Sequence, residues 1–154
     1  MLNQNMGKGI NNLILELHVP SFQPVRDFYA IFGFTEFRCE PTPMDNDVMG
    51  YLVLKRKDEI GETVLNFYGD KEKVSQHSYF KDFPSDTPRG YAVEVVIFVS
   101  NIEKLWDEVK DKLAKEQIIS PLKLRKWNNL NSAKQDFRVV DPFGFYICFS
   151  QFFE

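Results

Sequence analysis

The sequence predicts an α+β fold made of two copies of one module, in which a strand and a helix are followed by three strands. Short apolar runs rich in β-branched and aromatic residues alternate with turn residues, and two segments have the pattern of a helix. The order of segments restarts at an offset of 80 residues, where "VPSFQPV" (19–25) aligns with "VSNIEKL" (99–105). A period this long indicates two modules and not a solenoid.

The first module begins with a predicted strand at 13–19, where Val and Ile enrichment and the short length favour a strand. Ser21 is the expected N-cap of the helix that follows, and Pro24 falls in its first turn, where a missing N–H does no harm. The helix is predicted to run to about Phe32 and to end at Gly33. Three further strands are expected, at 35–40, 48–55 and 63–68.

A polar stretch at 69–90 then reads as a linker or a covering loop, and its three rings, Tyr79, Phe80 and Phe83, could cover a cavity mouth. We therefore expect an N-terminal extension at 1–12, a first module at 13–69, a linker at 70–89 and a second module at 90–152. Together the modules are expected to form one domain over 11–151.

The second module starts with a strongly β-prone run at 91–99, and Ser100-Asn101 offers a helix cap. The predicted helix carries an amphipathic stripe, which Trp106 widens: Ile102, Leu105, Val109 and Leu113. Three strands are expected after it, at 118–126, 134–140 and 145–151. The last two are joined by a tight turn, because Asp141-Pro142 favours its first corner and Gly144 permits positive φ.

Composition narrows the class of protein. A hydrophobic content of 44% and an aromatic content of 15% suffice for a core, and fifteen phenylalanines suggest a wide interior or an aromatic pocket. The net charge of -3 argues against nucleic-acid binding, and the basic cluster of Lys123, Arg125 and Lys126 is typical of a solvated strand end. Two lone cysteines, no signal-peptide pattern and no long apolar run lead us to expect a cytoplasmic protein that does not enter the membrane.

Two motifs give the chain a family resemblance. Phe28-Tyr29 followed by Gly33-Phe34, and Asp141-Pro142-x-Gly144 about 110 residues later, resemble signatures of the vicinal-oxygen-chelate superfamily, which includes glyoxalases, extradiol dioxygenases and bleomycin-resistance proteins. The resemblance implies paired βαβββ modules that form a cupped, incomplete β-barrel around a cavity. It also implies that, in the enzymes of the family, four inward strand positions hold a divalent metal.

Those four positions carry few metal ligands in this chain. They fall on Ile14, Glu94, Cys148 and either Asn66 or Phe67, whereas a catalytic divalent site needs about three His, Glu or Asp ligands. The resemblance is therefore closest to the metal-free, bleomycin-resistance-like members, and no cofactor is expected. The alternative is a metal-dependent lyase, isomerase or dioxygenase that holds Zn, Ni, Mn or Fe through an unusual set: Glu94, Glu16, His18 and Cys148.

The metal-free members imply a ligand-sequestering protein, in which rings stack on an aromatic drug and carboxylates neutralise its charge. The candidate ligand-binding residues are Glu16, Glu94, Trp127, Phe98, Phe67, Phe149 and Tyr51. We expect a small-molecule ligand and a homodimer, because modules of this family pair within one chain or across two. An interaction module with a vestigial cavity is a third alternative, and no catalytic residue is assigned.

Overall fold

A computed structural model describes residues 13–41, 50–69, 77–84, 87–126 and 133–153. Its first half contains a strand, a helix and three strands: β1 (Glu16–Val19), α1 (Gln23–Ile31), β2 (Thr35–Pro41), β3 (Gly50–Asp58) and β4 (Gly61–Gly69). The second half repeats this order: β5 (Glu94–Phe98), α3 (Ile102–Val109), β6 (Ile118–Lys126), β7 (Ala133–Val140) and β8 (Tyr146–Phe153). Short 3₁₀ turns lie at Phe80–Asp82 and Lys115–Gln117.

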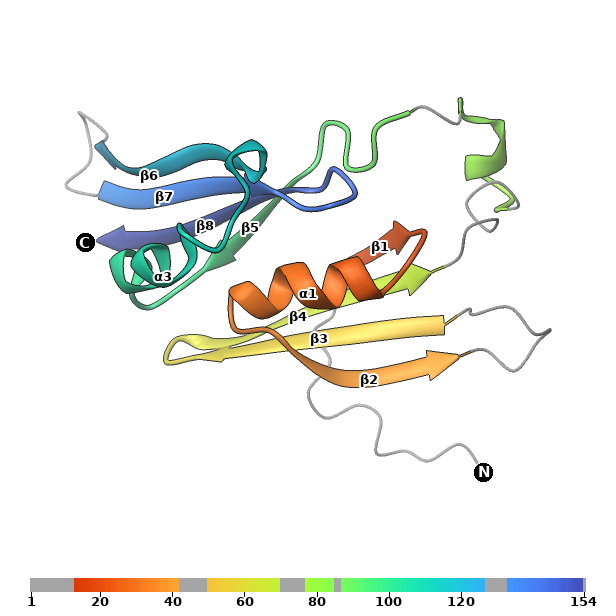
Figure 1. The fold of residues 1–154 in the computed structure, drawn as a ribbon, viewed down its shortest axis with the longest axis horizontal. Coiled ribbons are helices and arrows are strands. Elements are labelled where there is room, and N and C mark those ends of the chain that lie inside the picture. Colours follow the sequence, from red (N-terminus) through yellow and green to blue (C-terminus); the bar gives the residue numbers. More distant parts are fainter. Residues whose placement is uncertain (1–12, 42–49, 70–76, 85–86, 127–132, 154) are drawn as a thin grey trace.

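Each half forms one open four-stranded sheet, with the strand orders β1-β4-β3-β2 and β5-β8-β7-β6. In both, the first strand pairs in parallel with the last, and the other pairs are antiparallel. Neither sheet closes into a barrel. The duplicated α+β architecture predicted from the sequence is confirmed (Figure 1).

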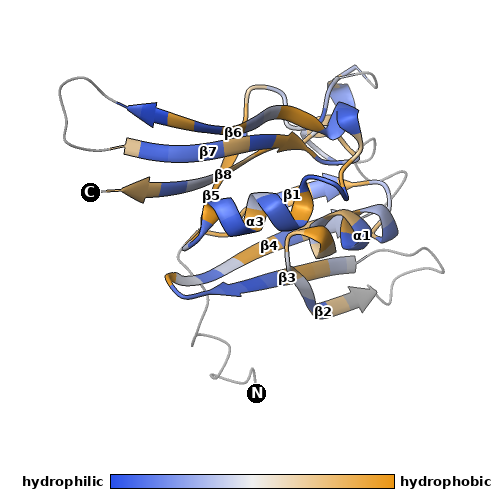
Figure 2. Ribbon diagram, turned by 60° about the vertical axis from the view of Figure 1, so that its left-hand side comes forward, coloured by the Kyte–Doolittle hydropathy of each residue, from blue (hydrophilic) through white to orange (hydrophobic). Residues whose placement is uncertain are grey.

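The two helices lie between the two sheets in both views (Figures 1 and 2). Tyr29 of α1 packs on Phe67 of β4, with ring centroids 5.2 Å apart, while Phe32 just after α1 stacks on Phe149 of β8 at 4.6 Å. Trp106 of α3 lies 5.0 Å from Phe137 of β7. The core therefore fills the space between the sheets, and alternation along each strand turns the other face of each sheet outward.

Several local predictions are confirmed and a few are corrected. Gly33 has a φ of +83° after α1, and Asn101 caps α3 by accepting a hydrogen bond from the Lys104 amide at 2.9 Å. The residue at the N-cap of α1 is Phe22, without a side-chain cap, so the prediction of Ser21 was wrong. The strand predicted at 91–99 begins only at Glu94, because a turn with Ala92 at a φ of +58° precedes it.

Asp58 links the two halves of the chain. One of its carboxylate oxygens accepts the backbone N–H of Ser100 at 3.1 Å, and the other accepts from the Arg56 guanidinium at 2.7 Å. Burial opposes ionisation, but these hydrogen bonds outweigh it and lower the pKa of Asp58 to about 2.

We expect Asp58→Asn to lower the free energy of unfolding by about 1–2 kcal/mol at pH 7, because the charge on Arg56 loses its partner. A carboxyl group whose pKa is depressed by folding stabilises the fold above its unfolded value and loses this effect as the pH falls. The difference between wild type and variant should therefore shrink between pH 3.8 and about 2. Urea unfolding at pH 7, 4 and 3 checks this. Glu62→Gln, which removes an exposed partner of Lys55, should change little, and equal losses in both variants would contradict the prediction.

Candidate functional site

The outer face of the first sheet gathers polar and aromatic side chains around β1. Glu16 pairs in register with Asn66, and His18 pairs with Tyr68, which in turn pairs with Tyr51 on β3. Phe67, between Asn66 and Tyr68, points to the opposite face and is completely buried. The structure thus assigns Asn66 to the outer face and Phe67 to the core, a choice that the sequence left open.

Aromatic rings from two distant segments cover this face. The His18 ring lies 5.1 Å from Tyr68, 5.7 Å from His77 and 5.4 Å from Phe80, measured between ring centroids. Tyr51 and Tyr68 are 5.2 Å apart. We call Glu16 together with these rings the first-sheet cluster. It combines aromatic faces with one carboxylate.

Within the described residues, two buried polar atoms have no hydrogen-bond partner, Nδ1 of His18 and Oδ1 of Asn66. Nε2 of His18 lies 3.4 Å from a Glu16 carboxylate oxygen, and burial lowers the pKa of His18, so the ring is neutral at pH 7. A neutral ring that donates from Nε2 has an acceptor at Nδ1. Both atoms are therefore acceptors that find no donor among the described residues.

Tyr51 lies beside the same carboxylate. Its pKa is raised, first by burial and then by the negative charge of Glu16, to which its hydroxyl donates a hydrogen bond. The phenol is thus neutral and a donor at physiological pH. Tyr51 is still about a third exposed.

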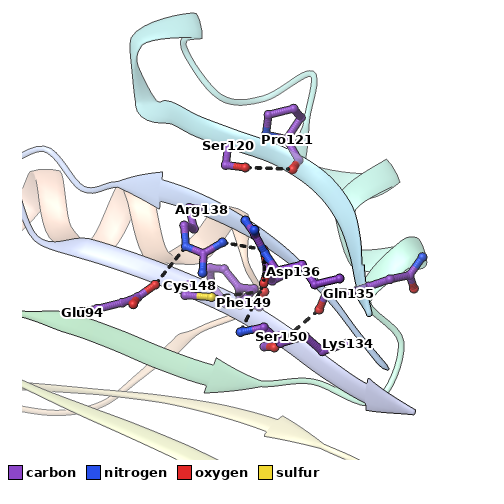
Figure 3. A network of polar contacts seen from close by, with 11 residues as sticks. Glu94, Ser120, Pro121, Lys134, Gln135, Asp136, Arg138, Cys148, Phe149 and Ser150 are labelled. Carbon is purple, nitrogen blue, oxygen red and sulfur yellow. Dashed lines mark hydrogen bonds and ion pairs between the residues drawn. The ribbon is translucent and has the colours of Figure 1, made fainter. Parts of the chain in front are cut away.

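The outer face of the second sheet carries Glu94 in an ion-pair network (Figure 3). Nε of Arg138 donates to Glu94 at 3.0 Å, and the same guanidinium also donates to Asp136, which is completely buried. Asp136 accepts from Arg125 as well, and Lys134 lies 3.3 Å away. Glu94 therefore already has a cationic partner, whereas no Lys or Arg in the described ranges forms an ion pair with Glu16.

The predicted ring candidates fall into three groups. Phe67 and Phe149 are completely buried and pack against α1 and Phe32, in the core. Phe98 is half exposed on the outer face of β5, where its ring lies 5.4 Å from Phe152. Trp127 lies outside the described residues.

The alternative metal set is divided between the two sheets. Glu16 and His18 are on the first, whereas Glu94 and Cys148 are on the second, next to the Arg138 guanidinium. Burial raises the pKa of Cys148 to about 11, so it remains a protonated thiol, a poor ligand. In the part of the chain that the structure describes, no three His, Cys, Asp or Glu side chains converge. Within one copy of the chain, the four residues of the alternative set therefore do not come together.

Two members of this site, Tyr68 and His77, were not predicted, while Asn66 was considered only as a metal position and Phe80 only as a cover of the cavity mouth. Alternation from Glu16 and the β1–β4 register would have found Asn66 and Tyr68, because strand partners share a face. No local signal brings residues 77–80 onto β1.

A separate pocket of about 510 Å³ lies by the N-terminus of α3 and contains none of the predicted site residues. The side-chain oxygens of its Asn101 and Gln151 already accept hydrogen bonds from backbone N–H groups at the start of α3.

None of the helices among the described residues has the length and apolar character needed to cross a membrane. A comparison with protein-family models and one with curated proteins found no match.

Solved structures, in contrast, match nearly the whole chain. A member of the glyoxalase/bleomycin resistance protein/dioxygenase superfamily from Sphaerobacter thermophilus is 12% identical with a TM-score of 0.58, covering 92% of this chain and 98% of its own. A bleomycin resistance determinant encoded on the transposon Tn5 is 16% identical with a TM-score of 0.56 and the same coverage. A bleomycin-binding protein complexed with bleomycin is 14% identical with a TM-score of 0.51, again covering 92% and 98%. These matches confirm the fold that the resemblance implied.

Proposed function

Since the chain has the fold of the vicinal-oxygen-chelate superfamily, we propose that it is a metal-free protein that sequesters an aromatic, positively charged small molecule on the outer face of its first sheet. The observation that carries the proposal is the first-sheet cluster. There the Glu16 carboxylate lies next to His18 and Tyr51, within a group of aromatic rings.

The chemistry of this face favours a ligand that donates hydrogen bonds. Glu16 supplies a negative charge and carboxylate oxygens that accept hydrogen bonds. Tyr68 and Phe80 supply ring faces, on which a cation gains about 0.5–2 kcal/mol. A planar cation with N–H groups would donate to Glu16 and cover the rings at once.

Two of the similar structures support the choice of ligand class, because one is a bleomycin resistance determinant and the other a bleomycin complex. The match to them is one of fold, so bleomycin itself is a test compound here and not an assigned ligand. The four candidate metal ligands do not favour the metal-dependent alternative, since Glu94 is already paired with Arg138.

We further propose that two copies of the chain pair through the outer faces of their sheets and enclose the ligand between them. Half-exposed apolar side chains such as Phe98 and Phe152 lie on the outer face of the second sheet, where a second copy and the enclosed ligand would cover them together. Sedimentation analysis with and without ligand checks the pairing. A monomer at every concentration would remove the dimer and leave the first-sheet cluster as an open binding face.

We expect Glu16→Gln to weaken the binding of a planar cation about tenfold, a loss of about 1.4 kcal/mol, because the amide keeps the shape and removes the charge. Titration calorimetry with proflavine and with bleomycin measures this. Glu108→Gln, an exposed change of the same type on α3, is the control and should leave binding unchanged.

Two results would contradict the proposal: no binding across such a panel, or equal affinity of wild type and Glu16→Gln. Elemental analysis of untreated protein is the companion measurement. One tightly bound transition metal per chain, lost on Glu94→Ala, would favour the metal-dependent enzyme instead.

A further inference from the structure

The outer face of the second sheet is divided into an apolar half and a cationic half. On the apolar half, Val96 and Phe98 of β5 and Phe152 of β8 are 45%, 46% and 53% exposed, and the two rings lie 5.4 Å apart. Phe152 pairs in register with Lys134 of β7. The two halves therefore meet along the β8–β7 pair.

Among the described residues, the cationic half carries four basic side chains and two carboxylates: Lys123, Arg125, Lys134, Arg138, Asp136 and Glu94. Their common side of the sheet follows from the register, because Lys123 pairs with Asp136 and Arg125 pairs with Lys134. Four positive charges against two negative ones leave an excess of two positive charges on this face. The chain as a whole carries a net charge of -3, so this excess is local.

Asp136 holds the cationic side chains in position. Its carboxylate is completely buried and accepts from Nε of Arg125 at 2.8 and 3.0 Å and from the Arg138 guanidinium, while Nζ of Lys134 lies 3.3 Å away. Of these three cations, Arg138 is also paired with Glu94. Arg125 is the most accessible of the three, with 43% of its side chain exposed, so an incoming anion can reach it.

We propose that this face recognises an acidic group attached to an aromatic ring, with the ring on Phe98 and Phe152 and a sulfonate, carboxylate or phosphate at Arg125 and Lys134. The charge and the register carry this inference, since the cations and the exposed rings are neighbours on adjacent strands. It goes beyond the proposed cation site, because the outer face of the second sheet points away from that of the first (Figures 1 and 2) and offers a separate site for a ligand of opposite charge. A guanidinium suits such anions because its planar donors match their oxygens.

The test uses two fluorescent probes that differ only in the anion. Anilinonaphthalene sulfonate has the rings and a sulfonate, and N-phenylnaphthylamine has the same rings and no charge. We expect the sulfonate to bind about tenfold more tightly, and Arg125→Ala to remove most of this difference. Arg125 is the residue to change because Asp136 keeps two cationic partners without it, so the fold is retained.

Controls separate this inference from the proposed function. Lys104→Ala removes an exposed charge on α3 and should leave both probes unaffected, and Arg125→Lys should retain part of the sulfonate preference. Arg125→Ala should still bind proflavine, and Glu16→Gln should still bind the sulfonate. Equal affinity for the two probes, or a sulfonate preference that survives Arg125→Ala, would overturn the inference. Failure of proflavine alone would overturn only the cation site.

Discussion

Replacing Phe149 with alanine is expected to lower the free energy of unfolding by roughly 3–5 kcal/mol, the largest effect we predict for a single residue. Phe149 is completely buried and stacks on Phe32 at 4.6 Å and on Phe137 at 5.1 Å. Phe32 follows α1 in the first half of the chain, so this stack joins the two halves. Loss of the ring would leave a cavity between rigid neighbours, which cannot collapse to fill it.

Phe98→Ala is the matched control. Phe98 of β5 pairs in register with Ser150, the residue that follows Phe149 on β8, but its own ring is half exposed on the outer face. We expect this variant to lose less than about 1 kcal/mol. Chemical denaturation of the two variants side by side makes the comparison. A small effect at Phe149 together with a large one at Phe98 would mean that the two faces of the second sheet are reversed.

The second large effect is expected at Asp141, in the turn between β7 and β8. One carboxylate oxygen accepts the backbone N–H groups of Phe143 and Phe145, both at 2.9 Å, and the other accepts the buried hydroxyl of Tyr29 at 3.2 Å. Asp141→Ala leaves all three donors without a partner, which we expect to cost about 3 kcal/mol, seen as a lower melting temperature and denaturation midpoint. Since Tyr29 belongs to α1, the loss weakens the turn and the contact between the halves together.

Asp141→Asn and Tyr29→Phe show which part of the network matters. The asparagine keeps an acceptor for the two backbone amides and should stay within about 1 kcal/mol of wild type, while Tyr29→Phe removes one bond and should lose about 1 kcal/mol. Burial raises the pKa of Asp141, so the ionised carboxylate is disfavoured in the folded protein and wild type should gain stability over Asp141→Asn as the pH falls. Equal stability of Asp141→Ala and Asp141→Asn would contradict this account.

Local chemistry made most of the fold predictable. The stripe of Ile102, Leu105 and Val109 is buried on α3 as its spacing indicates, and Asn101 caps that helix. Gly144 has a φ of +91° in the Asp141 turn, a conformation that few other residues adopt. Each of these features depends on side chains a few residues apart, so the sequence alone is enough to predict it.

The candidate site was less predictable because its contacts span the chain. Glu94 and Glu16 look alike in the sequence, each being a carboxylate on the first strand of a module. The structure pairs Glu94 with Arg138, 44 residues away, and surrounds Glu16 with rings from β1, β3, β4 and the segment around His77. Nothing near either residue in the sequence distinguishes these two environments.

The sequence by itself determined the duplicated order of strands and helices, the turn at Asp141 and the alternation that gives each strand two faces. Only the tertiary structure decided which face turns outward, because α1 and α3 pack between the sheets and bury one side of both. That packing places Phe149 in the core and Phe98 at the surface, although the two rings lie on neighbouring strands in adjacent register. Burial depends on what a second element covers, and this is a property of contacts between distant segments.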